Sequence, residues 1–296
     1  MKKIVVIAGV TGSGKTKLGV SLAKELGGEI ISADSVAIYR ELNIGSAKPS
    51  IEEQDGIPHH LIDIKDVTEK YDVMQFQRDS RELINEIIDR GNVPIIVGGT
   101  GLYLNALLYD YQFKEHGTPK EYAESISNEE LYEMLKAQSL EEAEKVHPNN
   151  RKRVIRSLNR LDLGQTSENA RDKLYYDAKV YFLQGDREYL YNRMNKRVDL
   201  MFEAGLENEV ASLYQKYSNL FSFQGLNSIG YREFEAYFLG NQTQEETKEL
   251  IKRNTRRFSK RQRTWFKHQT PSEWINVEQD NYEAKILSDI RAWLKE

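Results

Sequence analysis

The stretch Lys3–Thr16, KIVVIAGVTGSGKT, joins a continuous apolar run to a glycine-rich turn. An unbroken apolar run of this kind is typical of a strand that is buried on both faces of a parallel sheet. The turn, Gly9–Thr16, matches the phosphate-loop pattern GxxxxGK[ST], and residues 15–26 after it have a helical pattern that ends at Gly27. A strand, a glycine turn and a helix in this order predict a phosphate-binding loop.

Each part of the turn has a physical role in binding phosphate. Glycines let successive backbone N–H groups converge on phosphate oxygens, and the N-terminus of the following helix adds partial positive charge. Lys15 supplies a full charge, and the hydroxyl of Thr16 is a suitable ligand for Mg²⁺, which is the cofactor that we expect. The loop accepts ATP or another pyrophosphate ester. The expected phosphate-binding residues are Gly9, Val10, Thr11, Gly12, Ser13, Gly14, Lys15 and Thr16.

Two further stretches place polar residues directly after apolar strands. Asp34 follows Glu29–Ala33, and the sequence Gly98–Gly99 with Thr100 follows Val93–Val97. The carboxyl ends of parallel strands face the ligand crevice, so Asp34 is a candidate general base or Mg²⁺ ligand, with capping of the next turn as its structural alternative. The paired glycines allow the backbone to approach a ligand closely. Thr100 is expected to cap the helix that follows, and a capping Thr at a helix N-terminus can also contact an anion.

Strands that alternate with helices predict an α/β fold with a P-loop NTPase-like parallel sheet as its core. Residues 121–145 depart from this pattern, because they hold eight Glu against two Lys and have apolar residues at helical spacing. Together with a basic helix after Asn150, they predict a helical insertion. We expect residues 1–113 and 176–296 to form the core with a helical C-terminal part, and residues 114–175 to form a helical insertion domain.

The composition excludes several classes of protein. The 296 residues contain no cysteine, which rules out disulfides, cysteine zinc sites and cysteine nucleophiles and fits a reducing cytoplasm. No run of about 18 apolar residues occurs, so no membrane-spanning helix is expected. The chain is therefore expected to be a cytoplasmic enzyme without a membrane partner.

The net charge of −4 conceals an uneven distribution of charge. Ile251–Lys267 holds eight Lys or Arg residues and Arg151–Arg160 holds five, and neither segment contains an acid. An acidic protein that concentrates base in two places is expected to bind a polyanion. Phe258, Trp265 and Phe266 lie within the first segment, where aromatic residues are more often part of the core than stacked on bases.

The chain as a whole resembles the tRNA dimethylallyltransferases, also called tRNA isopentenyltransferases, through an ordered series of motifs. These motifs are GVTGSGKT at 9–16, GEIISADSVAIYRELNIGSAKP at 28–49, PHHLIDI at 58–64, YDVMQFQRD at 71–79, PIIVGGTGLYLNALLYD at 94–110, HPNNRKRVIRSL at 147–158, DREYLYNRMNKRVDLMFEAGLENEV at 186–210, SIGYREF at 228–234 and TRRFSKRQRTWFK at 255–267. The absence of a cysteine zinc finger after the last motif resembles the bacterial type.

The resemblance implies transfer of a dimethylallyl group from dimethylallyl diphosphate to N6 of adenine-37, next to the anticodon in tRNA, with release of diphosphate. It implies Asp34, Thr100 and Lys15 as catalytic residues, with Arg197 as a further contact to the diphosphate. It implies a tRNA anticodon stem-loop as partner, bound in part by the insertion domain, and a monomer. The residues expected to bind tRNA are Asp34, Ser35, Val36, Ala37, Thr100, Lys152, Arg153, Val154, Ile155, Arg156 and Arg193.

The chain departs from the family pattern in two places. The family usually has Gln where this chain has Ala37, which cannot form amide hydrogen bonds, and the insertion is several helical turns shorter. Two other enzymes remain as alternatives, a small-molecule P-loop kinase and a prenyltransferase that acts on free adenylate. Neither explains the two basic segments. A non-catalytic RNA-binding module does not explain why Lys15 and Asp34 both follow strands.

Overall fold

A computed structural model describes residues 1–111, 120–162 and 174–296. The chain divides into two compact units, one formed by Met1–Asp110 with Asp172–Glu296 and the other by Tyr111–Arg171. These limits lie within a few residues of the boundaries expected from the sequence. No helix among the described residues is long and apolar enough to cross a membrane.

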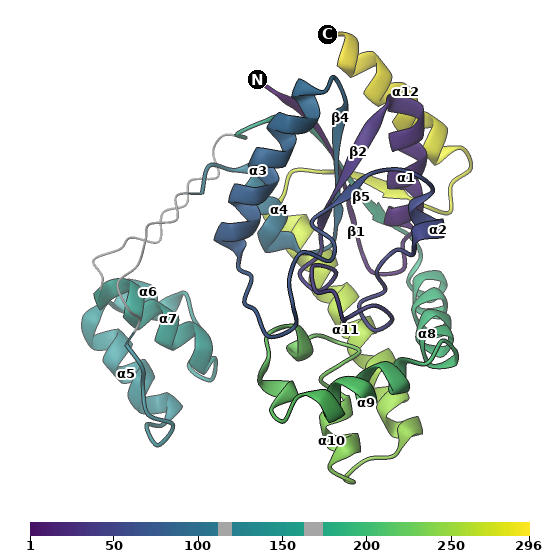
Figure 1. Ribbon diagram of the computed structural model, residues 1–296. Coiled ribbons are helices and arrows are strands. Elements are labelled where there is room, and N and C mark those ends of the chain that lie inside the picture. The colour runs from purple at the N-terminus through teal and green to yellow at the C-terminus, as the bar shows by residue number, and fades with distance from the viewer. Residues whose placement is uncertain (112–119, 163–173) are drawn as a thin grey trace. The chain divides into compact units, whose positions relative to one another are not determined.

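The first unit is built on a six-stranded parallel sheet with the strand order β3-β2-β4-β1-β5-β6 (Figure 1). The strands are β1 (Lys3–Gly9), β2 (Gly28–Ala33), β3 (His59–His60), β4 (Val93–Gly98), β5 (Asp177–Gln184) and β6 (Glu273–Asn276). The central strands β1 and β4 are almost entirely buried, as their unbroken apolar sequences predict. The α/β fold with a parallel sheet is thereby confirmed.

Helices cover both faces of this sheet. Figure 1 shows α1 (Lys15–Leu26) and α12 (Tyr282–Lys295) on one face, and α3 (Val73–Asp89) and α4 (Gly101–Leu108) on the other. The remaining helices of this unit are α2 (Ile51–Gln54), α8 (Arg187–Glu203), α9 (Leu206–Lys216), α10 (Phe234–Phe238) and α11 (Gln244–Gln269), with short 3₁₀ turns at Leu220–Ser222 and Gly225–Asn227.

The helix limits follow the local capping chemistry. The α1 helix has the bounds expected from its sequence and ends at Gly27, which has the left-handed backbone conformation with φ of +62°. The α3 helix begins at Val73, directly after Asp72, whose carboxylate accepts the N–H groups of Met74 and Gln75 in a capping box.

The second unit is a small helical domain with its own core. It contains α5 (Asn128–Gln138), α6 (Leu140–Glu144) and α7 (Arg151–Asp162). The fully buried side chains of this core are Leu131, Leu135, Ala143, Val154 and Leu158. The helical character of the insertion therefore follows from an apolar stripe that three short helices bury against one another.

The buried carboxylate of Glu29 anchors β2 to the neighbouring parts of the sheet. Glu29 is 5 % exposed and accepts hydrogen bonds from Arg90 Nε (3.0 Å) and Nη2 (2.8 Å) and from Asn92 Nδ2 (2.8 Å). His60 Nε2 lies 2.7 Å from the same carboxylate. The hydrogen bonds from Arg90 are the main reason that the pKa of Glu29 is lowered to about 2. Glu29 thus ties β2 both to β3 and to the turn before β4.

We predict that Glu29→Gln lowers the free energy of unfolding at pH 7 by about 2–3 kcal/mol, measured by denaturant titration. The pKa of Glu29 is lower in the folded than in the unfolded chain. The stabilisation is therefore complete above about pH 5 and is lost as the pH falls toward 2. Glu86→Gln is the matched control, because Glu86 is 61 % exposed and 3.8 Å from Arg90. A constant difference between parent and Glu29→Gln from pH 7 to 3 would contradict this assignment.

Candidate active site

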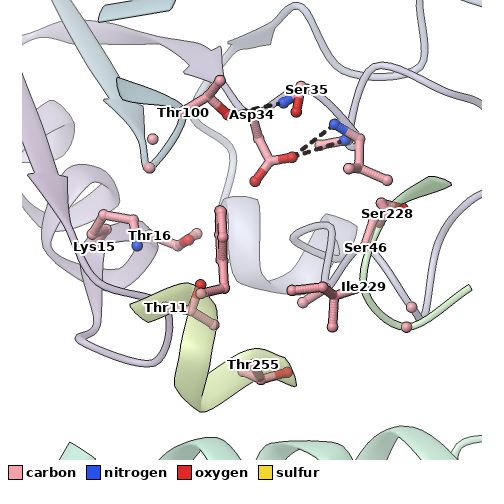
Figure 2. A pocket seen from close by; sticks show the side chains of 18 of the residues that line it. Thr11, Lys15, Thr16, Asp34, Ser35, Ser46, Thr100, Ser228, Ile229 and Thr255 are labelled. Carbon is pink, nitrogen blue, oxygen red and sulfur yellow. Dashed lines mark hydrogen bonds between the residues drawn. The ribbon is translucent and has the colours of Figure 1, made fainter. Parts of the chain in front are cut away.

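A cavity of about 380 Å³ opens in the first unit at the carboxyl ends of the central strands. Its lining includes the phosphate loop, the residues after β2 and β4, and parts of α8 and α11. Strand register explains why these segments meet. Gly98 at the end of β4 pairs with Ala8 of β1 and with Ala33 of β2, so the three strands end at the same level. Figure 2 shows side chains from these three strand ends directed toward a common space.

The phosphate loop has the conformation that its glycines predict. Gly12 and Gly14 have φ of +80° and +91°, a region that favours glycine. Lys15 Nζ donates a hydrogen bond to the Val10 carbonyl at 3.0 Å. Burial and the positive charge of Arg197 lower the pKa of Lys15 to about 8, against a smaller opposing effect of Asp34. An anion bound beside Lys15 would raise this pKa and favour the charged form of the side chain.

The eight residues predicted to bind phosphate divide into two groups. Thr11, Lys15 and Thr16 line the cavity (Figure 2). Gly9, Val10, Gly12, Ser13 and Gly14 form the backbone of the turn that holds them. The N–H of Thr11 is donated to Gln262 Oε1 at 3.0 Å, a contact that the sequence did not indicate.

Asp34 caps a turn with one carboxylate oxygen and lines the cavity. Its Oδ1 accepts the N–H groups of Val36 (2.8 Å) and Ala37 (3.3 Å), so the carboxylate caps the turn after β2. Asp34 also lines the cavity, and Figure 2 shows its carboxylate extending into that space. Within the described residues, Oδ2 has no hydrogen-bond donor. One oxygen therefore fixes the orientation of the group while the other is available to a ligand.

Thr100 does not cap α4 with its side chain, which was the structural alternative for this residue. Its Oγ1 instead accepts the N–H of Ser35 at 3.3 Å and lies at the cavity wall, where Figure 2 shows it close to Asp34. A hydroxyl that accepts one hydrogen bond still has its own proton to donate. Thr100 can therefore donate to an anion while it holds Ser35.

The positions next to Thr100 need glycine because neighbouring parts of the protein leave no room for a side chain. The sequence suggested instead that a ligand approaches the backbone closely there. A Cβ at Gly98 would lie 2.3 Å from the Ala33 carbonyl oxygen, and one at Gly101 would lie 2.3 Å from the ring of Trp265. A Cβ at Gly99 would lie 2.3 Å from Gln262 Nε2. These glycines let β2 and α11 pack directly against the loop that carries Thr100.

The two arginines at i, i+4 on α8 have different surroundings. Arg197 is largely buried at the cavity wall, and its Nη2 donates to the Ala47 carbonyl at 3.1 Å. Burial lowers the pKa of this guanidinium below its ordinary value. Arg193 is exposed, and its Nε donates to the Gly12 carbonyl at 2.8 Å. Arg197 is thus placed for a ligand in the cavity, whereas Arg193 supports the phosphate loop from outside.

The turn after Asp34 forms a further part of the cavity wall. Ser35, Val36 and Ala37 all line the cavity, and Ala37 is 4 % exposed. The backbone of Ala37 takes part in two hydrogen bonds, since its N–H is donated to Asp34 and its carbonyl accepts the N–H of Asp63 at 3.2 Å. The methyl group of Ala37 adds only apolar surface, where the family pattern has an amide.

In the second unit, the basic segment of α7 divides between structural and exposed residues. Lys152, Arg153 and Arg156 are exposed, whereas Arg151 donates to the backbone carbonyls of Ile126 (2.5 Å) and Ala123 (2.8 Å). Val154 and Ile155, which the sequence also predicted to contact tRNA, have their side chains turned to the core of this unit. The side chain of Val154 is fully buried, and that of Ile155 packs against the same core. Only the exposed basic residues of this set have side chains available to a partner.

The basic segment of α11 divides in the same way. Lys252 pairs with Asp199 and Glu249, each at 2.8 Å. Helical spacing places four other basic residues on one exposed stripe, and none has a carboxylate within 4.0 Å in the described part of the chain. They are Arg253, Arg257, Lys260 and Lys267. We call these four residues the basic stripe of α11.

The sequence favoured a core role for the aromatic residues of α11, and the structure agrees for only some of them. Phe266 is 1 % exposed and packs against Phe182, with the ring centroids 4.7 Å apart. Trp265 packs against α4 at Gly101. Phe258 lines the cavity, and Arg261 stacks on its ring at 5.4 Å.

Sequence reasoning missed several residues that complete the cavity. They are Ser46, Ala47, His59, Ser228, Ile229, Gly230, Thr255, Arg261 and Gln262. All nine lie inside the motifs that carry the family resemblance, which was the available signal. His59 Nδ1 lies 2.8 Å from the Ile57 carbonyl oxygen.

Comparisons with known proteins identify the family of this chain. The family model for IPP transferases matches residues 37–269. The tRNA dimethylallyltransferase of Geobacillus thermodenitrificans is 44 % identical over 288 residues, which cover 93 % of this chain and 91 % of that protein. A tRNA isopentenylpyrophosphate transferase structure from Bacillus halodurans has a TM-score of 0.78 and 38 % identity, with coverage of 100 % and 97 %.

A eukaryotic dimethylallyltransferase whose structure was determined acting on tRNA has a TM-score of 0.83 and 28 % identity. The alignment covers 97 % of this chain and 78 % of that one. The likeness thus extends from sequence to fold and spans both the phosphate loop and the basic helices. The chain belongs to the IPP transferase family of tRNA dimethylallyltransferases.

Proposed function

We propose that this enzyme transfers the dimethylallyl group of dimethylallyl diphosphate to N6 of adenine-37 in tRNA and releases diphosphate. The observation that carries the proposal is a single cavity lined by Thr11, Lys15 and Thr16 of the phosphate loop, by the partly buried cation of Arg197 and by the Asp34 carboxylate. Family membership supports tRNA as the acceptor and disfavours the two alternatives, a small-molecule kinase and an adenylate prenyltransferase.

The reaction forms a bond between N6 of adenine and the first carbon of the prenyl group. The bond between that carbon and the diphosphate oxygen breaks, and its electron pair leaves with the diphosphate. The free oxygen of Asp34 accepts the proton that N6 loses. Lys15 and Arg197 stabilise the charge that develops on the leaving diphosphate, and the Thr100 hydroxyl donates to the same group.

Mg²⁺ fits this cavity as a partner of the diphosphate. Among the described residues, no group of three or more His, Cys, Asp or Glu could hold a metal ion by itself. Mg²⁺ is commonly held by few protein groups together with substrate phosphates and water, and the Thr16 hydroxyl is the protein ligand that the loop offers. When bound, the ion would neutralise part of the charge on the leaving group.

The proposed acceptor requires the target base to leave its stack, because N6 must reach the reacting carbon inside the cavity. The exposed side chains of Lys152, Arg153 and Arg156 in one unit, and the basic stripe of α11 in the other, are the candidate contacts to the RNA backbone. Each is a separate surface patch of its own unit. Together they account for the two basic segments that a kinase would not need.

The direct test supplies unmodified tRNA, dimethylallyl diphosphate and Mg²⁺, digests the product and identifies the modified nucleoside by mass spectrometry. We expect N6-dimethylallyladenosine at position 37, and no transfer to free AMP. Transfer to AMP with none to tRNA, or phosphoryl transfer from ATP to a small acceptor, would refute the proposal.

We predict that Asp34→Asn lowers the single-turnover rate of prenyl transfer by about 10²- to 10⁴-fold, the usual range for general-base assistance. The asparagine keeps an oxygen for the N–H groups of Val36 and Ala37, so the turn should persist. Affinity for dimethylallyl diphosphate should change less than twofold. Asp72→Asn is the control and should keep the parental rate, since asparagine also caps helices well. Weaker diphosphate binding in Asp34→Asn would instead identify Asp34 as a metal ligand.

We predict that tRNA affinity falls steeply with salt, with a log–log slope of about −5 to −7. The double variant Arg253→Gln/Arg257→Gln should make this slope shallower by about 1.4 to 1.8, at about 0.7 to 0.9 per lost phosphate contact. Lys285→Gln/Lys295→Gln on α12 is the control, because it removes the same charge from exposed positions elsewhere. Equal slopes for the two double variants would exclude the basic stripe of α11 from the RNA contact.

A further inference from the structure

Gln262 lies where the loops after β1 and β4 meet. Its side chain is on the inner face of α11, lines the cavity, and leaves the residue 5 % exposed. Oε1 accepts the N–H of Thr11 at 3.0 Å, and Nε2 donates to the Gly99 carbonyl at 3.0 Å. One planar amide therefore joins the phosphate loop to the loop that carries Thr100.

The two partners determine which way the amide must point. A backbone N–H can only donate and a backbone carbonyl can only accept, so the oxygen of Gln262 faces Thr11 and the nitrogen faces Gly99. A carboxylate lacks the donor, and a hydrocarbon side chain lacks both groups. Glutamine matches this pair of partners because its amide supplies both functions at the end of a side chain of this length.

The contact with Gly99 continues to the catalytic residues. Gly99 precedes Thr100, whose Oγ1 accepts the N–H of Ser35, the residue after Asp34. The amide therefore connects the phosphate loop, through the Gly99–Thr100 backbone, to the turn that Asp34 begins. The hydrogen bonds in this chain are 3.0 to 3.3 Å long and lie at the cavity wall, where loss of a hydrogen bond leaves a polar group unsatisfied.

The sequence around Gly99 is adapted to this amide. A Cβ at position 99 would lie 2.3 Å from Gln262 Nε2 and 3.4 Å from the Gly9 carbonyl oxygen. Only glycine leaves room for Gln262 to enter between the two loops. The N–H of Thr11 is donated to Gln262, so contacts with an anion are left to the other amides of the loop and to Lys15.

We propose that Gln262 is a positioning residue for prenyl transfer, holding the diphosphate-binding loop and Thr100 at the separation that the transition state requires. The proposal rests on the function proposed above. It assigns no contact with substrate to Gln262. Its effect is exerted through Thr11 and Thr100, so its loss should slow the chemical step more than it weakens binding of tRNA.

The test compares Gln262→Met and Gln262→Glu with the parent and with Ser259→Ala. Ser259 is also buried on α11, but its Oγ donates to the Arg256 carbonyl of the same helix and it does not line the cavity. We expect Gln262→Met to lower the single-turnover rate by about 10- to 100-fold, while tRNA affinity and thermal unfolding stay close to those of Ser259→Ala.

Gln262→Glu adds a pH-dependent readout. Above its pKa, the carboxylate cannot donate to the Gly99 carbonyl, so the variant should be slow. Below its pKa, the protonated carboxyl donates to Gly99 and accepts from Thr11, as the amide does. The rate relative to the parent at the same pH should therefore rise as the pH falls. This variant also keeps the test decisive if Gln262→Met does not fold.

Two results would overturn the inference. One is a Gln262→Met rate within twofold of the parent. The other is a loss of rate, of tRNA affinity and of thermal stability in parallel, with no pH-dependent recovery in Gln262→Glu. Failure of the proposed function is distinguishable from both, because the parent and Ser259→Ala would then transfer no prenyl group to tRNA, and the positioning role would fall with it.

Discussion

The site depends on the register of three parallel strands. Gly98 pairs with Ala8 on one side and with Ala33 on the other, which brings three loops to one level of the sheet. The phosphate loop follows the first strand, Asp34 the second and Thr100 the third. A shift of one residue in any strand would turn the side chains to the opposite face and separate the base from the diphosphate site. The hydrogen bonds that Glu29 of β2 accepts from Arg90 and Asn92 oppose such a shift.

The cavity holds two cationic side chains whose desolvation costs free energy when no anion is bound. Burial lowers the pKa of both Lys15 and Arg197, and the positive charge of Arg197 lowers the pKa of Lys15 further. In the proposed function, a diphosphate with several negative charges relieves this condition, because it supplies the counter-charge. The proposal assigns to the same two cations the stabilisation of the leaving group, whose negative charge grows during transfer. Binding and catalysis would then depend on one arrangement of charge.

Sequence reasoning located the parts of the site that depend on local pattern. The loop Gly9–Thr16, the bounds of α1 and the placement of Asp34 after a strand follow from short-range chemistry, and the structure confirms them. The role of Gln262 could not be predicted, because it bonds to Thr11, 251 residues away along the chain. For the same reason, the glycines beside Thr100 suggested a ligand where the structure places β2 and α11. The burial of Val154 likewise depends on how α5 and α7 pack.

The central claim is that the phosphate loop of this enzyme holds a prenyl diphosphate, and equilibrium affinity tests it directly. Isothermal titration of the intact chain with dimethylallyl diphosphate and, separately, with ATP, each with Mg²⁺, compares the two ligands at one site. The account predicts that dimethylallyl diphosphate binds at least about tenfold more tightly, a difference of about 1.4 kcal/mol, and that Lys15→Met removes most of this binding. Tighter binding of ATP, or binding of the prenyl diphosphate that is unchanged in Lys15→Met, would contradict it.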